Sequence, residues 1–190
     1  MIKPCSGSMD RTPPKEILWK TFPHRLFFGY ESTRTWGPGG GAFMNPESNS
    51  EDRTYMCMYR ITLEQFNDVL LNENSLGCDM SSPLFDTSDL NSVVTTKGSM
   101  CLELLKKGRY KNVVYMGKEC DIPILTMTCP LTDVESFKSG KLPLRAPCIK
   151  YANTLIKGLV EGKQLSEEEA MAYIHEASTK PLKEMVTMHY

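Results

Sequence analysis

The acidic side chain that best fits a chemical role is Glu73, which follows a segment expected to be helical. The C-terminal end of a helix carries partial negative charge, and a carboxyl group enclosed there has a raised pKa. Such a group suits general acid–base catalysis near neutral pH. Because the chain contains 23 Asp and Glu residues, Glu73 also fits a simpler interpretation as a solvated acid near a helix end, and both interpretations stay open.

Two further pairs of residues have side chains or backbone groups that suit a binding site. Gly7 and Ser8, within CSGSM, could offer backbone N–H donors to an anionic group. The alternative is an unstructured terminus. Tyr110 and Tyr151 are either hydroxyl donors in a pocket or core aromatic residues with one polar edge.

The glycine-rich piece GPGGGA at residues 37–42 matches the spacing of a dinucleotide-binding loop. Such a loop must open into a helix. Here Asn45 and Pro46 follow a short apolar stretch instead, so we reject the nucleotide-binding interpretation. The glycines predict that another backbone or a ligand approaches this strand closely.

Metal and disulfide chemistry find little support in the sequence. The seven cysteines are scattered without a CxxC pair, and the three histidines are far apart without an HExxH pattern. This spacing does not match a zinc site or a disulfide framework. We therefore expect no metal, free thiols and a reducing, cytoplasmic compartment.

The composition is that of a globular protein. The chain has 190 residues, of which 41% are hydrophobic and 24% are charged, with a net charge of −1. We expect a single domain over residues 1–190. The near-neutral charge and the lack of a long apolar run predict neither a nucleic-acid partner nor a membrane partner, and no secretory signal is visible.

The elements expected from periodicity and capping place Glu73 after a strand and a helix. Thr62 with Gln65, and Ser166 with Glu169, form capping boxes that begin helices, and Pro147 fits the first turn of another helix. Strands are expected at residues 24–30, 39–44, 54–61, 110–116 and 122–129. We expect residues 1–20 to be irregular or a remnant N-terminal loop, although residues 17–19 could begin a strand. We also expect an exposed insertion at 75–97 and a loop at 131–145.

Strands early and helices late in the chain favour an α+β fold with a mixed or antiparallel, barrel-like sheet. The small barrel would be flanked by the helices. This arrangement would hold Glu73 on a rigid strand–helix unit.

Three stretches in this order resemble the γ-glutamylcyclotransferase-like superfamily. The first, GGGAFMNPESNSEDRTYMCMYRITLEQFNDVLLNEN, is similar to the Gly-Gly strand, second strand, helix and terminal Glu of that family. The second, GRYKNVVYMGKECDIPILTMT, is similar to its Gly-aromatic-Tyr strand and hairpin partner. The third, LPLRAPCIKYANTLIKGLVEGKQLSEEEAMAYI, is similar to its two closing helices. The resemblance covers roughly residues 22–178.

The resemblance implies an enzyme that converts a small γ-glutamyl compound to pyroglutamate and a free amine, as in glutathione metabolism. It implies Glu73 as the general acid/base and Gly7, Ser8, Tyr110 and Tyr151 as substrate-binding residues, with no cofactor. A single carboxylate can accept the proton of the substrate ammonium and return it to the leaving amine.

The chain departs from the family pattern at three places. CSGSM stands where the family has a strand and a Tyr-Gly-Ser-Asn loop, Asn74 replaces the Gly that usually follows the Glu, and the segment after Glu73 is longer. A catalytically inactive binding or regulatory module is therefore the alternative interpretation. The oligomeric state is not indicated by the sequence.

Overall fold

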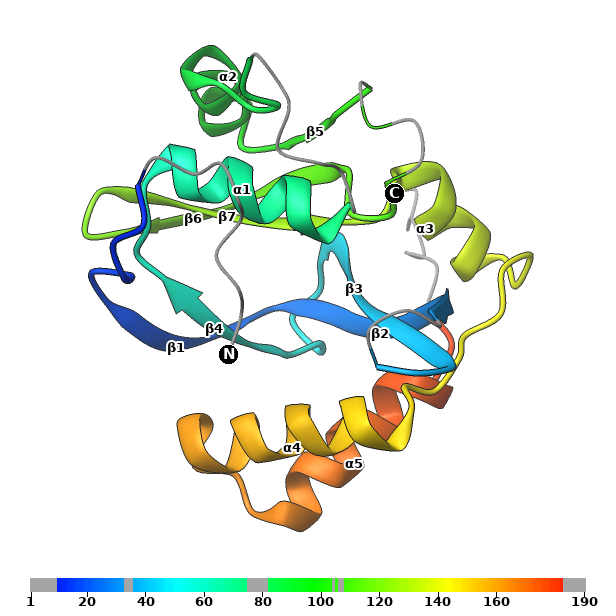
Figure 1. Cartoon of the computed structure of the whole chain (residues 1–190). Coiled ribbons are helices and arrows are strands. Elements are labelled where there is room, and N and C mark those ends of the chain that lie inside the picture. Colours follow the sequence, from blue (N-terminus) through cyan, green and yellow to red (C-terminus); the bar gives the residue numbers. More distant parts are fainter. Residues whose placement is uncertain (1–9, 33–35, 75–81, 104, 106–107, 183–190) are drawn as a thin grey trace. The chain divides into compact units, whose positions relative to one another are not determined.

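The computed structural model describes residues 10–32, 36–74, 82–103, 105 and 108–182 (Figure 1). The strands are β1 (Ile17–Phe22), β2 (His24–Ser32), β3 (Gly39–Ser48), β4 (Thr54–Tyr59), β5 (Ser99–Cys101), β6 (Asn112–Glu119) and β7 (Ile122–Thr128). The helices are α1 (Leu63–Glu73), α2 (Thr87–Thr96), α3 (Leu131–Lys138), α4 (Ile149–Lys163) and α5 (Glu167–Thr179).

The chain divides into two compact units. The first unit comprises Met1–Leu18 and Met58–Pro130, and the second comprises Trp19–Cys57 and Leu131–Tyr190. Each unit has its own cluster of buried apolar side chains. The organisation of residues 1–190 as a single domain stays a prediction, since units of this kind also occur within one domain.

The expected α+β class is confirmed, but the expected barrel is wrong for the residues that the structure describes. The strands form three separate sheets, β1–β4, β2–β3 and β5–β6–β7. A closed barrel requires every edge strand to pair with a further neighbour. Here β5 contributes only three residues, and register shifts interrupt the β2–β3 ladder near both of its ends.

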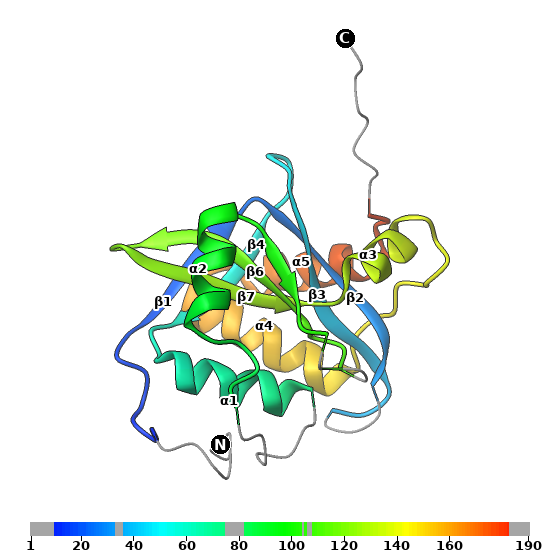
Figure 2. The same cartoon turned by 90° about the horizontal axis from the view of Figure 1, so that it is seen from above.

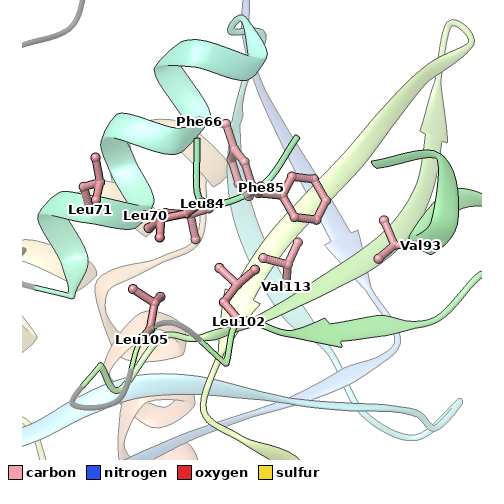
Figure 3. Packing of buried hydrophobic residues seen from close by; sticks show 9 residues of the cluster. All are labelled: Phe66, Leu70, Leu71, Leu84, Phe85, Val93, Leu102, Leu105 and Val113. Atoms are coloured by element: carbon pink, nitrogen blue, oxygen red, sulfur yellow. The ribbon is translucent and has the colours of Figure 1, made fainter. Parts of the chain in front are cut away.

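The core of the first unit lies between α1 and the β5–β6–β7 sheet (Figure 3). The capping box of Thr62 and Gln65 begins α1 as predicted. The spacing of Phe66 and Leu70 at i and i+4 places both on one face of the helix. Leu70 and Val113 of β6 are fully buried, so α1 is held to the sheet by close apolar packing.

The second half of the predicted insertion contributes to this core. Leu84 and Phe85 are buried, and α2 adds the buried Val93. Helix α2 packs against β5 and β6 (Figure 2). Asp86 begins the helix with a capping box, and Lys97 ends it in a left-handed conformation.

In the second unit, α4 and α5 pack on β2, on β3 and on Tyr55 at the start of β4. Phe28 of β2 is fully buried among apolar residues of both helices, including Leu159 and Ile174. The capping box of Ser166 and Glu169 begins α5 as predicted. Helix α4 follows Pro147 but begins at Ile149, because Cys148 is its N-cap.

Residues 131–138 form helix α3, although the sequence predicted a loop at 131–145. The Ser-Gly-Lys piece and Pro143 that suggested a loop lie beyond the helix end, where Gly140 adopts a positive φ of 73°. Tertiary contacts hold this short helix: Phe137 packs on Phe27, and Tyr30 donates a hydrogen bond to Asp133.

Lys138 at the end of α3 is almost completely enclosed, with 5% of its side chain exposed. Its amine donates to Glu47 at 2.6 Å and to Glu135 at 2.9 Å. Burial lowers the pKa of this amine, but the two carboxylates outweigh that effect and raise the pKa above its ordinary value.

None of the helices in the described part of the chain is long and apolar enough to cross a membrane.

Two glycines of α4 give a matched test of the packing in the second unit. A Cβ at Gly162 would lie 2.1 Å from Nε1 of Trp19, whereas one at Gly158 would lie 3.9 Å from the same indole ring. We expect Gly162→Ala to lower the free energy of unfolding by about 1–2 kcal/mol because the indole must move. Gly158→Ala should raise it by up to about 1 kcal/mol through helix propensity.

Urea unfolding measures both variants. Trp36→Phe serves as the background, so that Trp19 is the one remaining indole and its emission reports the displacement. Equal effects of the two substitutions would contradict this packing.

Candidate functional site

The candidate site lies at the C-terminal end of α1. Glu73 is the last residue of this helix, within its final turn, rather than just past the end as the sequence suggested. The final turn contains no basic residue, and Asn74 is the C-cap. The Glu73 carboxylate therefore stands in the negative end of the helix dipole.

Nearby protein atoms raise the pKa of the Glu73 carboxyl through desolvation. The residue as a whole nevertheless remains exposed to solvent. Contact with water limits how far this desolvation can raise the pKa of the carboxyl group. Within the described residues the carboxylate has no hydrogen-bond or ion-pair partner, so it is available to a cationic or proton-donating ligand.

Asn74 joins the end of α1 to the segment that precedes β6. Its side-chain amide donates to the carbonyl of Tyr110 at 3.1 Å and to the carbonyl of Leu70 at 2.9 Å. The backbone N–H of Tyr110 donates in return to Oδ1 of Asn74 at 3.0 Å. One buried side chain thus pairs with both polar groups of a single peptide residue, as a neighbouring strand would.

This clamp accounts for the glycine in the GRY piece of the sequence. A Cβ at Gly108 would lie 2.2 Å from Oδ1 of Asn74, so a larger residue would displace the amide. The structure therefore joins the segment of Tyr110 to Asn74, the residue that follows Glu73. The roles of Glu73 and Tyr110 as site residues stay a prediction. Sequence reasoning missed Asn74, since it treated this residue only as a departure from a family pattern.

The remaining predicted site residues are Gly7, Ser8 and Tyr151. Gly7 and Ser8 lie outside the described residues. Tyr151 belongs to the second unit, where its ring stacks on Trp36 at 5.3 Å between centroids and meets Phe28 edge-on at 6.3 Å. These contacts fit the interpretation of Tyr151 as a packing residue.

The glycine-rich stretch serves close backbone approach, as predicted. A Cβ at Gly40 would lie 2.0 Å from the carbonyl oxygen of Arg145, and one at Gly39 would lie 2.4 Å from the backbone N of Cys148. The N–H of Gly40 also donates to the carbonyl of Ala146 at 2.8 Å. Residues 39–42 of the stretch begin β3, and the stretch does not open into a helix.

No group of three or more His, Cys, Asp or Glu side chains converges as a metal site within the described ranges. The cysteines that the structure describes at positions 57, 101, 120, 129 and 148 are free thiols.

Comparison with known proteins gives one strong similarity. The chain is 62% identical over 180 residues to "Histone deacetylase 5" of Arabidopsis thaliana. The aligned region covers 95% of this chain and 27% of that relative, so the chain spans about a quarter of the relative's length. No family model matches the chain, and no solved structure matches it.

This similarity overturns the function expected from the sequence. The relative is named as a histone deacetylase, which points away from a γ-glutamyl cyclotransferase. We therefore withdraw the predicted lyase or transferase activity. The γ-glutamyl substrate, the pyroglutamate product and the link to glutathione metabolism are withdrawn with it. The error arose because short stretches in a matching order were used to infer chemistry, whereas such an order reports only on the arrangement of elements.

Removal of the Asn74 side chain should destabilise the first unit. Asn74→Ala leaves the buried N–H and carbonyl of Tyr110 without their partner, and we expect a loss of about 2–4 kcal/mol in the free energy of unfolding. Asn72→Ala is the control, because Asn72 lies exposed on the same helix end, and it should change stability by less than about 0.5 kcal/mol. Chemical denaturation of both variants tests this; similar losses would rule out the clamp.

The Glu73 carboxyl should make stability depend on pH. Its folded-state pKa is raised, so its contribution to stability is present below the unfolded-state pKa and is lost as the pH rises through the folded-state pKa. Glu73→Gln removes this loss, so the variant should be more stable than the wild type at pH 7, and the difference should shrink as the pH falls below 4. Thermal unfolding across pH 3–7 measures it, and a difference that grows on acidification would refute the raised pKa.

Proposed function

We propose that this chain is a non-catalytic module of a histone-deacetylase-type protein and serves there as a binding or docking element. The observation that carries the proposal is the 62% identity over almost the whole chain to a relative about four times its length. A region that matches so closely and so completely has the properties of a segment retained as one piece.

The packing of the two units supports a module that folds from its own residues. The first unit encloses Phe85 and Val113 completely, and the second unit encloses Phe28. Each Å² of apolar surface that is buried contributes about 25 cal/mol to the free energy of folding, and this favours the folded state of each cluster. Neither cluster includes a residue from the other unit.

Three polar side chains that could otherwise assist amide hydrolysis, those of Asn74, Tyr173 and His24, are engaged in holding the structure. An oxyanion needs free donors, and an attacking water needs a nearby base. Both amide hydrogens of Asn74 are donated to backbone carbonyls. The Tyr173 hydroxyl accepts from the N–H of Tyr55, and burial raises the pKa of Tyr173 to about 12. The His24 ring lies 3.1 Å from the carbonyl of Asn45.

We also propose that the order of elements follows the γ-glutamylcyclotransferase-like pattern as a scaffold, without its chemistry. Two consecutive strands, β3 and β4, lead into α1, which ends at Glu73. The Tyr110 segment pairs with the residue after Glu73. Helices α4 and α5 follow the Ala146–Pro147 dipeptide.

Deacetylation assays test the proposed function. The isolated chain should release no acetate from an acetyl-lysine peptide. The full-length relative should keep its kcat/KM on a short acetyl-lysine peptide within about threefold after deletion of the segment that matches this chain, a change of less than about 1 kcal/mol in the barrier. Acetate release is measured by chromatography.

Two results would contradict the proposal. Acetate release by the isolated chain would make it an enzyme, and its loss in Glu73→Gln would identify the base. Loss of peptide hydrolysis from a deletion protein with unchanged thermal unfolding of its remaining part would place the segment within the catalytic unit.

A further inference from the structure

Trp36 is held rigidly on the surface of the second unit. Its ring is stacked on Tyr151 with an interplanar angle of 22°, and its carbonyl accepts from the Cys148 thiol at 3.0 Å. Trp36 nevertheless remains 37% exposed. A large aromatic side chain that is fixed but uncovered is the kind of anchor that dominates protein interfaces.

One cation lies over this indole, and a second is exposed on the segment that precedes α4. Lys150 Nζ lies 6.0 Å above the Trp36 ring, and Arg145 is exposed on the segment that runs against Gly40. Neither Lys150 nor Arg145 has an acidic partner within the described residues. The uncapped first turn of α4 adds partial positive charge.

The same charge bias is visible in the sequence around α4. From Ser136 to Val160 there are five Lys and Arg residues and no Asp or Glu, in a chain whose net charge is −1. Of these five, Lys138 is enclosed by Glu47 and Glu135. Sequence reasoning missed this acid-free stretch because it considered only the charge of the whole chain.

An aliphatic side chain completes the surface. Ile149, the first residue of α4, is 81% exposed beside Lys150. We call the surface formed by Trp36, Arg145, Ile149 and Lys150 the Trp36 patch. Its members combine an aromatic anchor, an aliphatic contact and two unpaired cations, and they belong to the second unit alone.

We propose that the Trp36 patch binds an acidic protein segment that also carries an apolar residue. Carboxylates would pair with Lys150 and Arg145, while the apolar residue would cover Ile149 and the open edge of Trp36. Electrostatic complementarity of this kind sets specificity and association rate. The inference rests on the proposed function, since it gives the docking module its site and the chemistry of its partner.

Nucleic acid fits the patch less well than an acidic protein segment. Domains that bind nucleic acid usually have an isoelectric point above about 9, whereas that of this chain is about 6.3. Ile149 offers nothing to a phosphate backbone, and its exposure suits contact with another protein.

A displayed library of random 12-residue peptides tests the proposal. Peptides that bind the purified chain are kept, and those that also bind the Lys150→Glu variant are removed. The strongest peptide and its form with every Asp and Glu changed to Asn and Gln are then titrated by anisotropy. We expect the selected peptides to be rich in acidic residues around an aliphatic or aromatic residue, and the neutral form to bind at least about tenfold more weakly.

Variants locate the binding. Lys150→Glu, Arg145→Glu and Trp36→Ala should each weaken binding of the selected peptide by about tenfold. Lys118→Glu makes the same change of charge at an exposed position of β6 in the first unit, and it should leave the affinity unchanged. Thermal unfolding confirms that each variant is folded.

Three results would overturn the proposal. The first is selected peptides that are not acidic, and the second is an equal loss of peptide affinity in Lys118→Glu and Lys150→Glu. The third is a 12-nucleotide thymidine oligomer that binds more tightly than any selected peptide and loses this binding in the same patch variants. Because these measurements do not involve deacetylation, they separate failure of the patch from failure of the proposed function.

Discussion

The first unit depends on two buried side-chain amides, Asn67 within α1 and Asn74 at its C-cap. Asn74 pairs with the backbone of Tyr110, and Asn67 pairs in the same way with both polar groups of Phe85 at 2.8 and 2.9 Å. The two residues are seven positions apart, so they lie on one face of the helix, two turns from each other. The two amides thereby join two irregular segments to one helix. Without them, the buried backbone groups of these segments would lack hydrogen-bond partners, and the folded state would be less stable.

The features that the sequence predicted are those determined by near neighbours in the chain. The capping boxes at Thr62 and Ser166 involve residues three positions apart, so their chemistry is complete within one turn. The hairpin of β6 and β7 likewise depends on a short turn, at Cys120 and Asp121. The glycines of β3 were understood correctly because residues without side chains directly permit a second backbone to come close.

The features that the sequence did not predict are set by distant contacts. Helix α3 has only eight residues and is stable through Phe137, Tyr30 and Lys138 rather than through its own propensity. The predicted closed barrel likewise depended on pairing between strands that are far apart in the chain. The site roles of Glu73 and Tyr110 stay predictions. The contacts of Asn74 and Trp36 could not be predicted, because their partners are far away in the chain.

The enclosed position of Lys138 has a consequence for chemical modification of this protein. A lysine whose side chain is 5% exposed and whose amine donates to two carboxylates should react far more slowly with enzymes and reagents that acylate lysine side chains. Exposed lysines such as Lys141 and Lys150 have no such protection. An acyl group found on Lys138 would therefore mark molecules in which α3 had separated from β3. The extent of acylation at Lys138 would measure how often this separation occurs.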